Sequence, residues 1–201
     1  MVKIYFLIFV LLFSLETFSK GISLSTLCKK NNAMACKDFG LKTNTPLYLK
    51  KSCDLNEGSG CMELGLILFK EKKLDQGQLA FQKGCKLNDG DSCSYLGAYL
   101  HKRGEIENAR LLYQKACNLK SGKGCYNLGI LNESSGEEND ALNSYSKACN
   151  NDIAQGCVNN AYLIEKNKGD IKEVLELYKK ACDLKSKLGC KNLAQINNFN
   201  K

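Results

Sequence analysis

The feature that most constrains this chain is a pair of cysteines eight positions apart that occurs six times. Every one of the twelve cysteines belongs to such a pair. The pairs start 32 residues apart from Cys53 to Cys149, then 33 residues later at Cys182, after a shorter first step of 25 from Cys28. A fixed period of this length is typical of repeat arrays. The six segments are CKKNNAMAC (28–36), CDLNEGSGC (53–61), CKLNDGDSC (85–93), CNLKSGKGC (117–125), CNNDIAQGC (149–157) and CDLKSKLGC (182–190).

Each repeat contains the pattern of two amphipathic helices. In residues 93–117, Leu96, Gly97 and Leu100 follow the cysteine at offsets of three, four and seven, which places them on one helical face. We call the helix that carries the second cysteine of a pair the A helix. After the break HKRGE, apolar residues recur with helical spacing up to Cys117. We call this second helix the B helix. With a single proline in the chain and no strand-like alternation, the sequence predicts an all-α fold of antiparallel helical hairpins.

The cysteines join the end of one B helix to the start of the next A helix, with seven residues between them as the expected turn. Twelve cysteines permit many pairings, but nearest-neighbour closure is the simplest rule that treats all six pairs alike, and we expect it. The predicted disulfides join Cys28 with Cys36, Cys53 with Cys61, Cys85 with Cys93, Cys117 with Cys125, Cys149 with Cys157, and Cys182 with Cys190.

The cysteine spacing does not favour the other uses of cysteine. Zinc sites need cysteines two to four residues apart or accompanying histidines, whereas the chain has only His101. A redox-active pair is usually spaced as CxxC, which is absent. We therefore expect no metal and no cofactor.

The first nineteen residues have the pattern of a secretory signal peptide, with Lys3, an apolar run from Ile4 to Phe13, and small residues before a cleavage point after Ser19. The apolar run is too short to span a bilayer, which takes about 20 residues, so we expect no stable membrane insertion after cleavage. An uncleaved anchor is the alternative. Export to the periplasm or the exterior would allow disulfides to form and persist. We expect residues 20–201 to form a single domain of about five repeats and a C-terminal capping helix.

The charge of +8 suggests acidic partners, but the lysines are scattered and no basic run with interleaved aromatic residues appears. A lysine-rich solvated surface is the plainer interpretation, and we expect no nucleic-acid binding.

The recurring strings LYQKACNLKSGKGCYNLG (112–129) and LYKKACDLKSKLGCKNLA (177–194) resemble the Sel1-like repeats of the Helicobacter cysteine-rich protein family, which are related to tetratricopeptide repeats. The resemblance implies a right-handed superhelical solenoid of αα-hairpins, with a disulfide at each B-to-A turn, in a secreted or periplasmic protein. This chain departs from the family in its shorter period. Asn132 and Asn160 also replace apolar residues, which suggests looser packing there.

Hairpin solenoids bind partners on a concave face lined by A helices. By analogy with tetratricopeptide repeats, the inward positions are one and five residues after each A-helix cysteine. A protein or peptide from a host or from the cell envelope is the expected partner. The alternative is that these side chains only pack between repeats. The candidate groove residues are Met62, Leu66, Ser94, Ala98, Tyr126, Ile130, Val158 and Tyr162.

The resemblance also implies an enzymatic alternative, since the family carries a β-lactamase or penicillin-binding label. β-Lactams or peptidoglycan fragments would then be the ligands, and antibiotic resistance the role. SYSK (144–147) matches the Ser-x-x-Lys element of serine β-lactamases in letters. However, Lys147 is a recurring repeat lysine, and no SDN or KTG follows. A zinc lactamase would need several histidines. We expect any lactam turnover to be slow and not to depend on one serine, and no catalytic residue can be named.

Overall fold

A computed structural model describes residues 23–199 and the side chains of 23–197. The predicted signal peptide lies outside the described residues. The described part is all-α, with twelve helices in consecutive hairpins, as the sequence predicts. The helices are α2 (Leu24–Lys29), α3 (Ala33–Thr43), α4 (Pro46–Asp54), α5 (Gly58–Lys70), α6 (Leu74–Lys86), α7 (Gly90–Lys102), α8 (Ile106–Asn118), α9 (Gly122–Ser134), α10 (Glu138–Asn150), α11 (Ala154–Lys166), α12 (Ile171–Asp183) and α13 (Lys187–Phe199).

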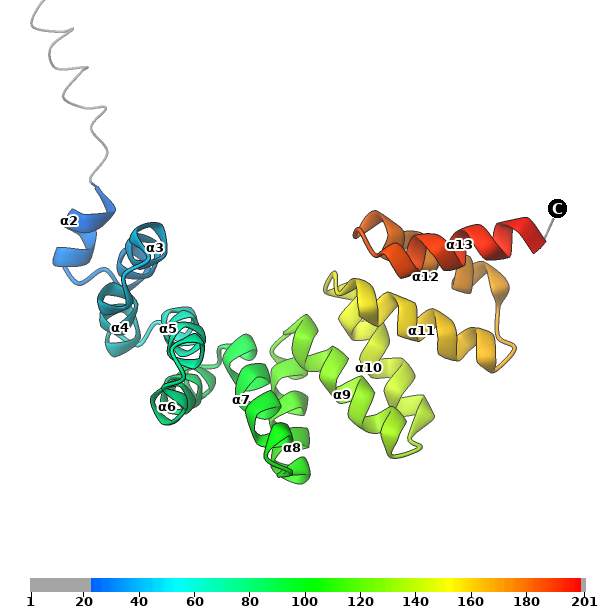
Figure 1. The fold of residues 1–201 in the computed structure, drawn as a ribbon, viewed down its shortest axis with the longest axis horizontal. Helices are drawn as coiled ribbons and strands as arrows, with labels where there is room; N and C mark the ends of the chain where they lie inside the picture. Colours follow the sequence, from blue (N-terminus) through cyan, green and yellow to red (C-terminus); the bar gives the residue numbers. More distant parts are fainter. Residues whose placement is uncertain (1–22, 200–201) are drawn as a thin grey trace, which may run out of the picture.

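The hairpins follow one another along an arc (Figure 1). The odd-numbered helices from α3 to α13 are the A helices, and the even-numbered ones are the B helices. In Figure 1, α5 and α7 lie on the inner side of the arc, whereas α6 and α8 lie on the outer side. From α3 to α9, successive A helices contact each other more closely than successive B helices do. Over these repeats the A helices line the inner side of the arc.

The turns between repeats are shorter than the sequence suggested. Both cysteines of a pair lie within helices, so only Leu119, Lys120 and Ser121 separate α8 from α9, and the prediction of a seven-residue turn is wrong. The chain reverses because Lys120 adopts a left-handed conformation with φ of 63°. The amide of Ser121 then donates to the carbonyl of Ala116, which satisfies a helix-end acceptor. Asn, Asp or Lys takes this conformation at the other turns between repeats, at Asn31, Asn56, Asn88, Asp152 and Lys185.

Six disulfides join the two cysteines of each pair, and no described cysteine is free. They hold the Cα atoms of each pair 4.4–4.6 Å apart, which brings the two helices almost into backbone contact. All twelve sulfurs are therefore used in linking one repeat to the next. The bonds are Cys28 with Cys36, Cys53 with Cys61, Cys85 with Cys93, Cys117 with Cys125, Cys149 with Cys157, and Cys182 with Cys190.

The second cysteine of each pair lies at the start of an A helix, where the two helices come closest. Cys36, Cys61, Cys93 and Cys125 are all 0% exposed, so these sulfurs are sealed from solvent. At each of the last five disulfides, the residues that precede the two cysteines face each other. The space between them holds the side chain of only one of the two. One of the two residues that precede the cysteines is accordingly glycine, in the pairs Ser52/Gly60, Gly84/Ser92, Ala116/Gly124, Ala148/Gly156 and Ala181/Gly189.

An aromatic side chain from each of the B helices α6, α8, α10 and α12 fills the space inside its repeat. Phe81, Tyr113, Tyr145 and Tyr178 lie four residues before the B-helix cysteine, and all are at most 2% exposed. The rings of Phe81, Tyr113 and Tyr145 pack on A-helix glycines: a Cβ added to Gly129 would lie 2.5 Å from the Tyr145 ring. The hydroxyl of Tyr145 donates to Glu133 at 2.6 Å, and that of Tyr178 donates to Glu165 at 3.1 Å. These four repeats therefore each bury an aromatic ring, and the last two also satisfy its hydroxyl.

Asn132 is buried rather than loosely packed, being 5% exposed. Its side-chain oxygen accepts from Arg110 at 2.7 Å, and its nitrogen donates to the Ser144 hydroxyl at 3.3 Å. Asn160 is also buried, at 4% exposed. The expectation of looser packing at these two positions is wrong, and at Asn132 polar partners replace the apolar contact.

The buried phenols should titrate late. Burial raises the pKa of Tyr113 to about 12, and burial together with Glu165 raises the pKa of Tyr178 to about 12. The fold thus favours the neutral phenol. This stabilisation is complete below the unfolded value of about 10 and is lost as the pH rises towards 12. Absorbance at 295 nm should show a late phase that shrinks in Tyr178→Phe. A folded protein in which all tyrosines ionise together near about 10 would contradict this.

Among residues 23–199, no helix combines the length and the apolar character that a membrane crossing requires.

Candidate functional site

Two adjoining cavities form a trough along the A-helix face. The first, of about 480 Å³, lies between the second and third A helices, α5 and α7, with α6 beneath them. The second, of about 320 Å³, lies between α7 and α9 and reaches the start of α11. Tyr95 and Ala98 of α7 line both cavities, so the two form one surface. Ligand-binding clefts commonly have volumes in this range.

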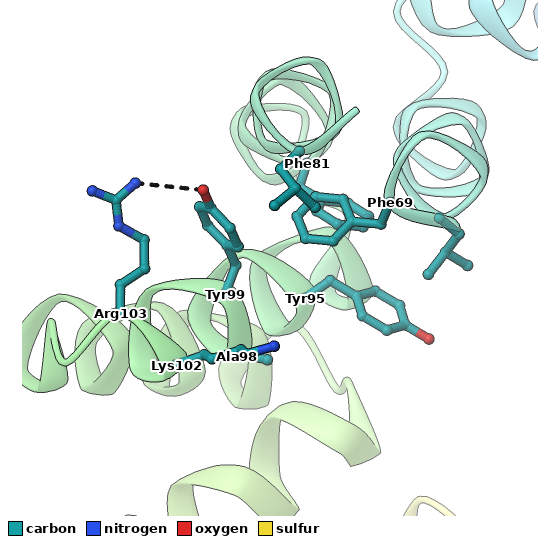
Figure 2. Close-up of a pocket in the computed structure, with 9 residues that line it drawn as sticks. Phe69, Phe81, Tyr95, Ala98, Tyr99, Lys102 and Arg103 are labelled. Atoms are coloured by element: carbon teal, nitrogen blue, oxygen red, sulfur yellow. Dashed lines mark hydrogen bonds between the residues drawn. The ribbon is translucent and has the colours of Figure 1, made fainter. Parts of the chain in front are cut away.

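The larger cavity, the aromatic pocket, has a floor and walls of aromatic rings. It is lined by Leu66, Phe69, Leu74, Phe81, Tyr95, Ala98, Tyr99, Lys102 and Arg103. The ring of Phe69 lies 5.1 Å from that of Phe81 and meets Tyr99 edge to face at 5.3 Å. Tyr95 stacks on Phe81 at 5.3 Å, with 16° between the rings. Figure 2 shows these side chains together with Lys102 and Arg103. The pocket is apolar inside and carries cations at its edge.

The aromatic pocket exists because three positions depart from the pattern of the later repeats. In the last two repeats, the B-helix tyrosine donates to a glutamate eight residues after the A-helix cysteine. The residue two positions after the next A-helix cysteine is an asparagine in both cases, Asn159 or Asn192. At the same three positions the α5–α7 unit has Phe69, Phe81 and Tyr95. The hydroxyl, carboxylate and amide are thus replaced by rings.

A cavity at the far end of the array shows the contrast. It occupies the corresponding place between α11 and α13, has a volume of about 290 Å³, and is lined by Tyr162, Glu165, Tyr178, Asn192, Gln195 and Ile196. Its charged group is a carboxylate, whereas those of the aromatic pocket are cations. The same inter-repeat space therefore has opposite chemistry at the two ends of the face.

The cations of the trough are held by tyrosines. Lys123 donates to the Tyr95 hydroxyl at 2.6 Å and lies 4.8 Å from the centre of its ring. This hydrogen bond raises the pKa of the Lys123 ammonium group. Arg103 lies 5.7 Å from the Tyr99 ring centre and also pairs with Glu105 at 3.4 Å. Lys102 is exposed, and it forms no ion pair with the described residues.

The predicted groove residues fall into two groups. Of the positions one residue after the cysteine, Ser94 and Val158 are buried at 2% and 6% exposed, and Met62 and Tyr126 are half-buried. These side chains mainly pack between helices. Of the positions five residues after the cysteine, Leu66 is half-buried, whereas Ala98, Ile130 and Tyr162 are exposed. Leu66, Ser94, Ala98 and Tyr126 line the trough, and Tyr162 lines the cavity at the far end.

Phe69, Phe81, Tyr95 and Tyr99 were not among the predicted groove residues. The analogy with tetratricopeptide repeats gives only the positions one and five residues after each A-helix cysteine. It therefore omits Phe69, Tyr95 and Tyr99, which lie at other A-helix positions, and Phe81, which lies on a B helix. One signal in the sequence could have indicated them. Aromatic residues replace the glutamate, the tyrosine and the asparagine of the later repeats at all three equivalent positions of one repeat unit.

Ser144 lies on the other side of the array and is 4% exposed. Its hydroxyl faces the Asn132 amide at 3.3 Å, and no hydrogen bond joins it to Lys147 in the described part of the chain. His101 is exposed in the last turn of α7. Within residues 23–199, no group of three or more potential metal-ligating His, Cys, Asp or Glu side chains occurs.

Comparison with solved structures identifies the fold as that of Sel1-like repeat proteins. The c5321 protein, a protective antigen of uropathogenic Escherichia coli with an SLR fold, superposes with a TM-score of 0.71 at 18% identity. The alignment covers 86% of this chain but only 42% of c5321. A Sel1 repeat protein from Oxalobacter formigenes gives a TM-score of 0.73 at 20% identity, covering 83% and 78% of the two chains. No family model and no curated protein matches the sequence.

Proposed function

We propose that this chain is a secreted or periplasmic scaffold that binds a protein or peptide partner through the trough on its A-helix face. The observation that carries the proposal is the pair of adjoining cavities that share Tyr95 and Ala98 as lining residues. Extended peptides and helices are commonly bound in grooves of this kind, where apolar pockets receive side chains. Repeat arrays also form such surfaces by stacking identical units.

The six disulfides support the extracytoplasmic location, because disulfides persist in oxidising compartments and are rare in the cytosol. We propose that residues 1–19 are removed on export and that residues 20–201 form one domain. The disulfide at each junction between repeats also supports placing the chain in the Helicobacter cysteine-rich family that its repeats resemble. A β-lactam hydrolase gains no support, because Ser144 is buried against Asn132.

The test is a selection of random phage-displayed peptides on the oxidised protein, followed by affinity measurements on two variants. In the double variant Ala98→Glu/Ile130→Glu, both substituted side chains are exposed on the A-helix face, so we expect folding to be retained. The matched control is Leu111→Glu on the outer helix α8, where the leucine is 69% exposed. The selected peptides should bind the double variant at least about tenfold more weakly and the control unchanged.

Circular dichroism before and after each substitution establishes that the helices are intact. Peptides that bind the double variant as well as the unmodified protein, or that lose affinity with Leu111→Glu, would place binding elsewhere and overturn the proposal.

A further inference from the structure

The aromatic pocket and its rim define the chemistry of the segment that the trough would receive. Its interior is formed by carbon-rich surfaces of Leu66, Phe69, Phe81 and Tyr95, so a polar side chain placed there would lose its hydration without compensation. A cavity of about 480 Å³ has room for one bulky apolar side chain. This part of the site selects for an aromatic or leucine-like anchor.

The charges along the trough select for the residues beside that anchor. The described residues that line the two cavities include three cations, Lys102, Arg103 and Lys123, and no carboxylate. Arg103 is partly neutralised by Glu105, so Lys102 and Lys123 are the main charges available to a ligand. Glu63 and Asp91 lie close enough to act on Lys123 but do not line either cavity. A ligand that carries carboxylates on each side of its anchor would complement this distribution.

From this geometry we infer that the trough binds a polypeptide segment in which a bulky apolar side chain, seated in the aromatic pocket, is flanked by acidic residues. The inference rests on the proposed function and specifies the partner. The anchor enters between α5 and α7. The carboxylates then lie towards Lys102 on one side and towards Lys123, across the shared Tyr95–Ala98 surface, on the other. A segment with basic neighbours would meet like charges at the same points.

The test uses three fluorescein-labelled peptides and anisotropy at low salt. The first is Glu-Asp-Glu-Phe-Glu-Asp-Glu, the second has serine in place of phenylalanine, and the third has lysine in place of every acidic residue. The first should bind at least about tenfold more tightly than either of the others. Its affinity should fall as sodium chloride is raised, since exposed charges are screened.

Two variants locate the site. Ala98→Trp should fill the space between the two cavities and weaken the first peptide at least about tenfold. Lys102→Glu should weaken the first peptide but not the lysine peptide, because only the acidic residues are attracted by Lys102. Both original side chains are exposed, so circular dichroism should stay unchanged. Leu111→Glu is again the control.

The inference is overturned if the lysine peptide binds as tightly as the acidic one, if Ala98→Trp has no effect, or if none of the three peptides binds at millimolar concentration. The inference is also overturned if dodecanoate competes with the acidic peptide at equal affinity, because the trough would then bind a small amphipathic acid rather than a polypeptide segment. If the phage selection yields peptides that lack acidic residues but bind the same face, this inference is wrong, whereas the proposed function is still supported.

Discussion

Reducing the six disulfides is expected to unfold most of the array at 37 °C. Closing a loop of about nine residues stabilises a fold by about 2.5 kcal/mol in the chain-entropy view, so six equivalent loops have an upper bound of about 15 kcal/mol. This bound is as large as the whole stability of a typical domain, about 5–15 kcal/mol. Far-ultraviolet circular dichroism during urea titration, with and without a phosphine reductant, should show a large fall in the unfolding midpoint.

The single disulfide variant Cys117→Ala/Cys125→Ala separates reduction from other effects of the reductant. It should lose about 2.5 kcal/mol and lower the midpoint by a fraction of the full effect. A reduced chain that unfolds at the same urea concentration as the oxidised one would show that helix packing alone holds the repeats together.

The substitution Gly156→Ala should destabilise the protein by about 2–3 kcal/mol, although alanine is the better helix former. A Cβ atom at this position would lie 2.7 Å from the Cβ of Ala148 and 3.0 Å from the backbone nitrogen of Cys149. The disulfide between Cys149 and Cys157 holds the two helices at a Cα separation of 4.5 Å, so they cannot move apart to relieve the overlap. Urea unfolding of the oxidised variant measures the loss.

The compensating change Ala148→Gly provides the matched control. The double variant Ala148→Gly/Gly156→Ala should recover to within about 1 kcal/mol of the original, because it removes the 2.7 Å overlap with the Ala148 Cβ and leaves only the 3.0 Å approach to the Cys149 nitrogen. The chain already contains both arrangements. At one junction the A helix has Ser92 and the B helix has Gly84, whereas at the preceding junction the B helix has Ser52 and the A helix has Gly60. If Gly156→Ala proves neutral, the steric account of these junctions is wrong.

The sequence predicts the all-α hairpin array because its helices follow from local patterns, and the 32-residue period places equivalent residues in equivalent positions. It does not predict the length of the turns. Those turns rest on left-handed residues such as Asn88, Lys120 and Asp152, and lysine carries no turn signal comparable to glycine. The prediction of a turn over all seven residues between two cysteines is therefore wrong, because some of those residues, such as Asn118 and Gly122, belong to the helices.

The sequence predicts only part of the candidate site. The rest was missed because it depends on how neighbouring repeats pack. Exposed positions on an A helix, such as Ala98 and Ile130, follow from helical periodicity. The aromatic pocket depends on Phe69, Phe81 and Tyr95, which come from three helices and meet only after two repeats have packed. Burial of Ser94 and Val158 likewise depends on the distance between neighbouring A helices, which a single repeat does not reveal.

The most direct test of the central claim, that the trough on the A-helix face is the binding site, is photocrosslinking of a phage-selected peptide. Benzoylphenylalanine would replace Gln155, which lines the second cavity of the trough, in one variant and Leu111 in the other, both exposed in the folded protein. We expect the peptide to crosslink from position 155, excess unlabelled peptide to suppress this crosslink, and position 111 to give none. Equal crosslinking at the two positions, or crosslinking from 111 alone, would contradict the central claim.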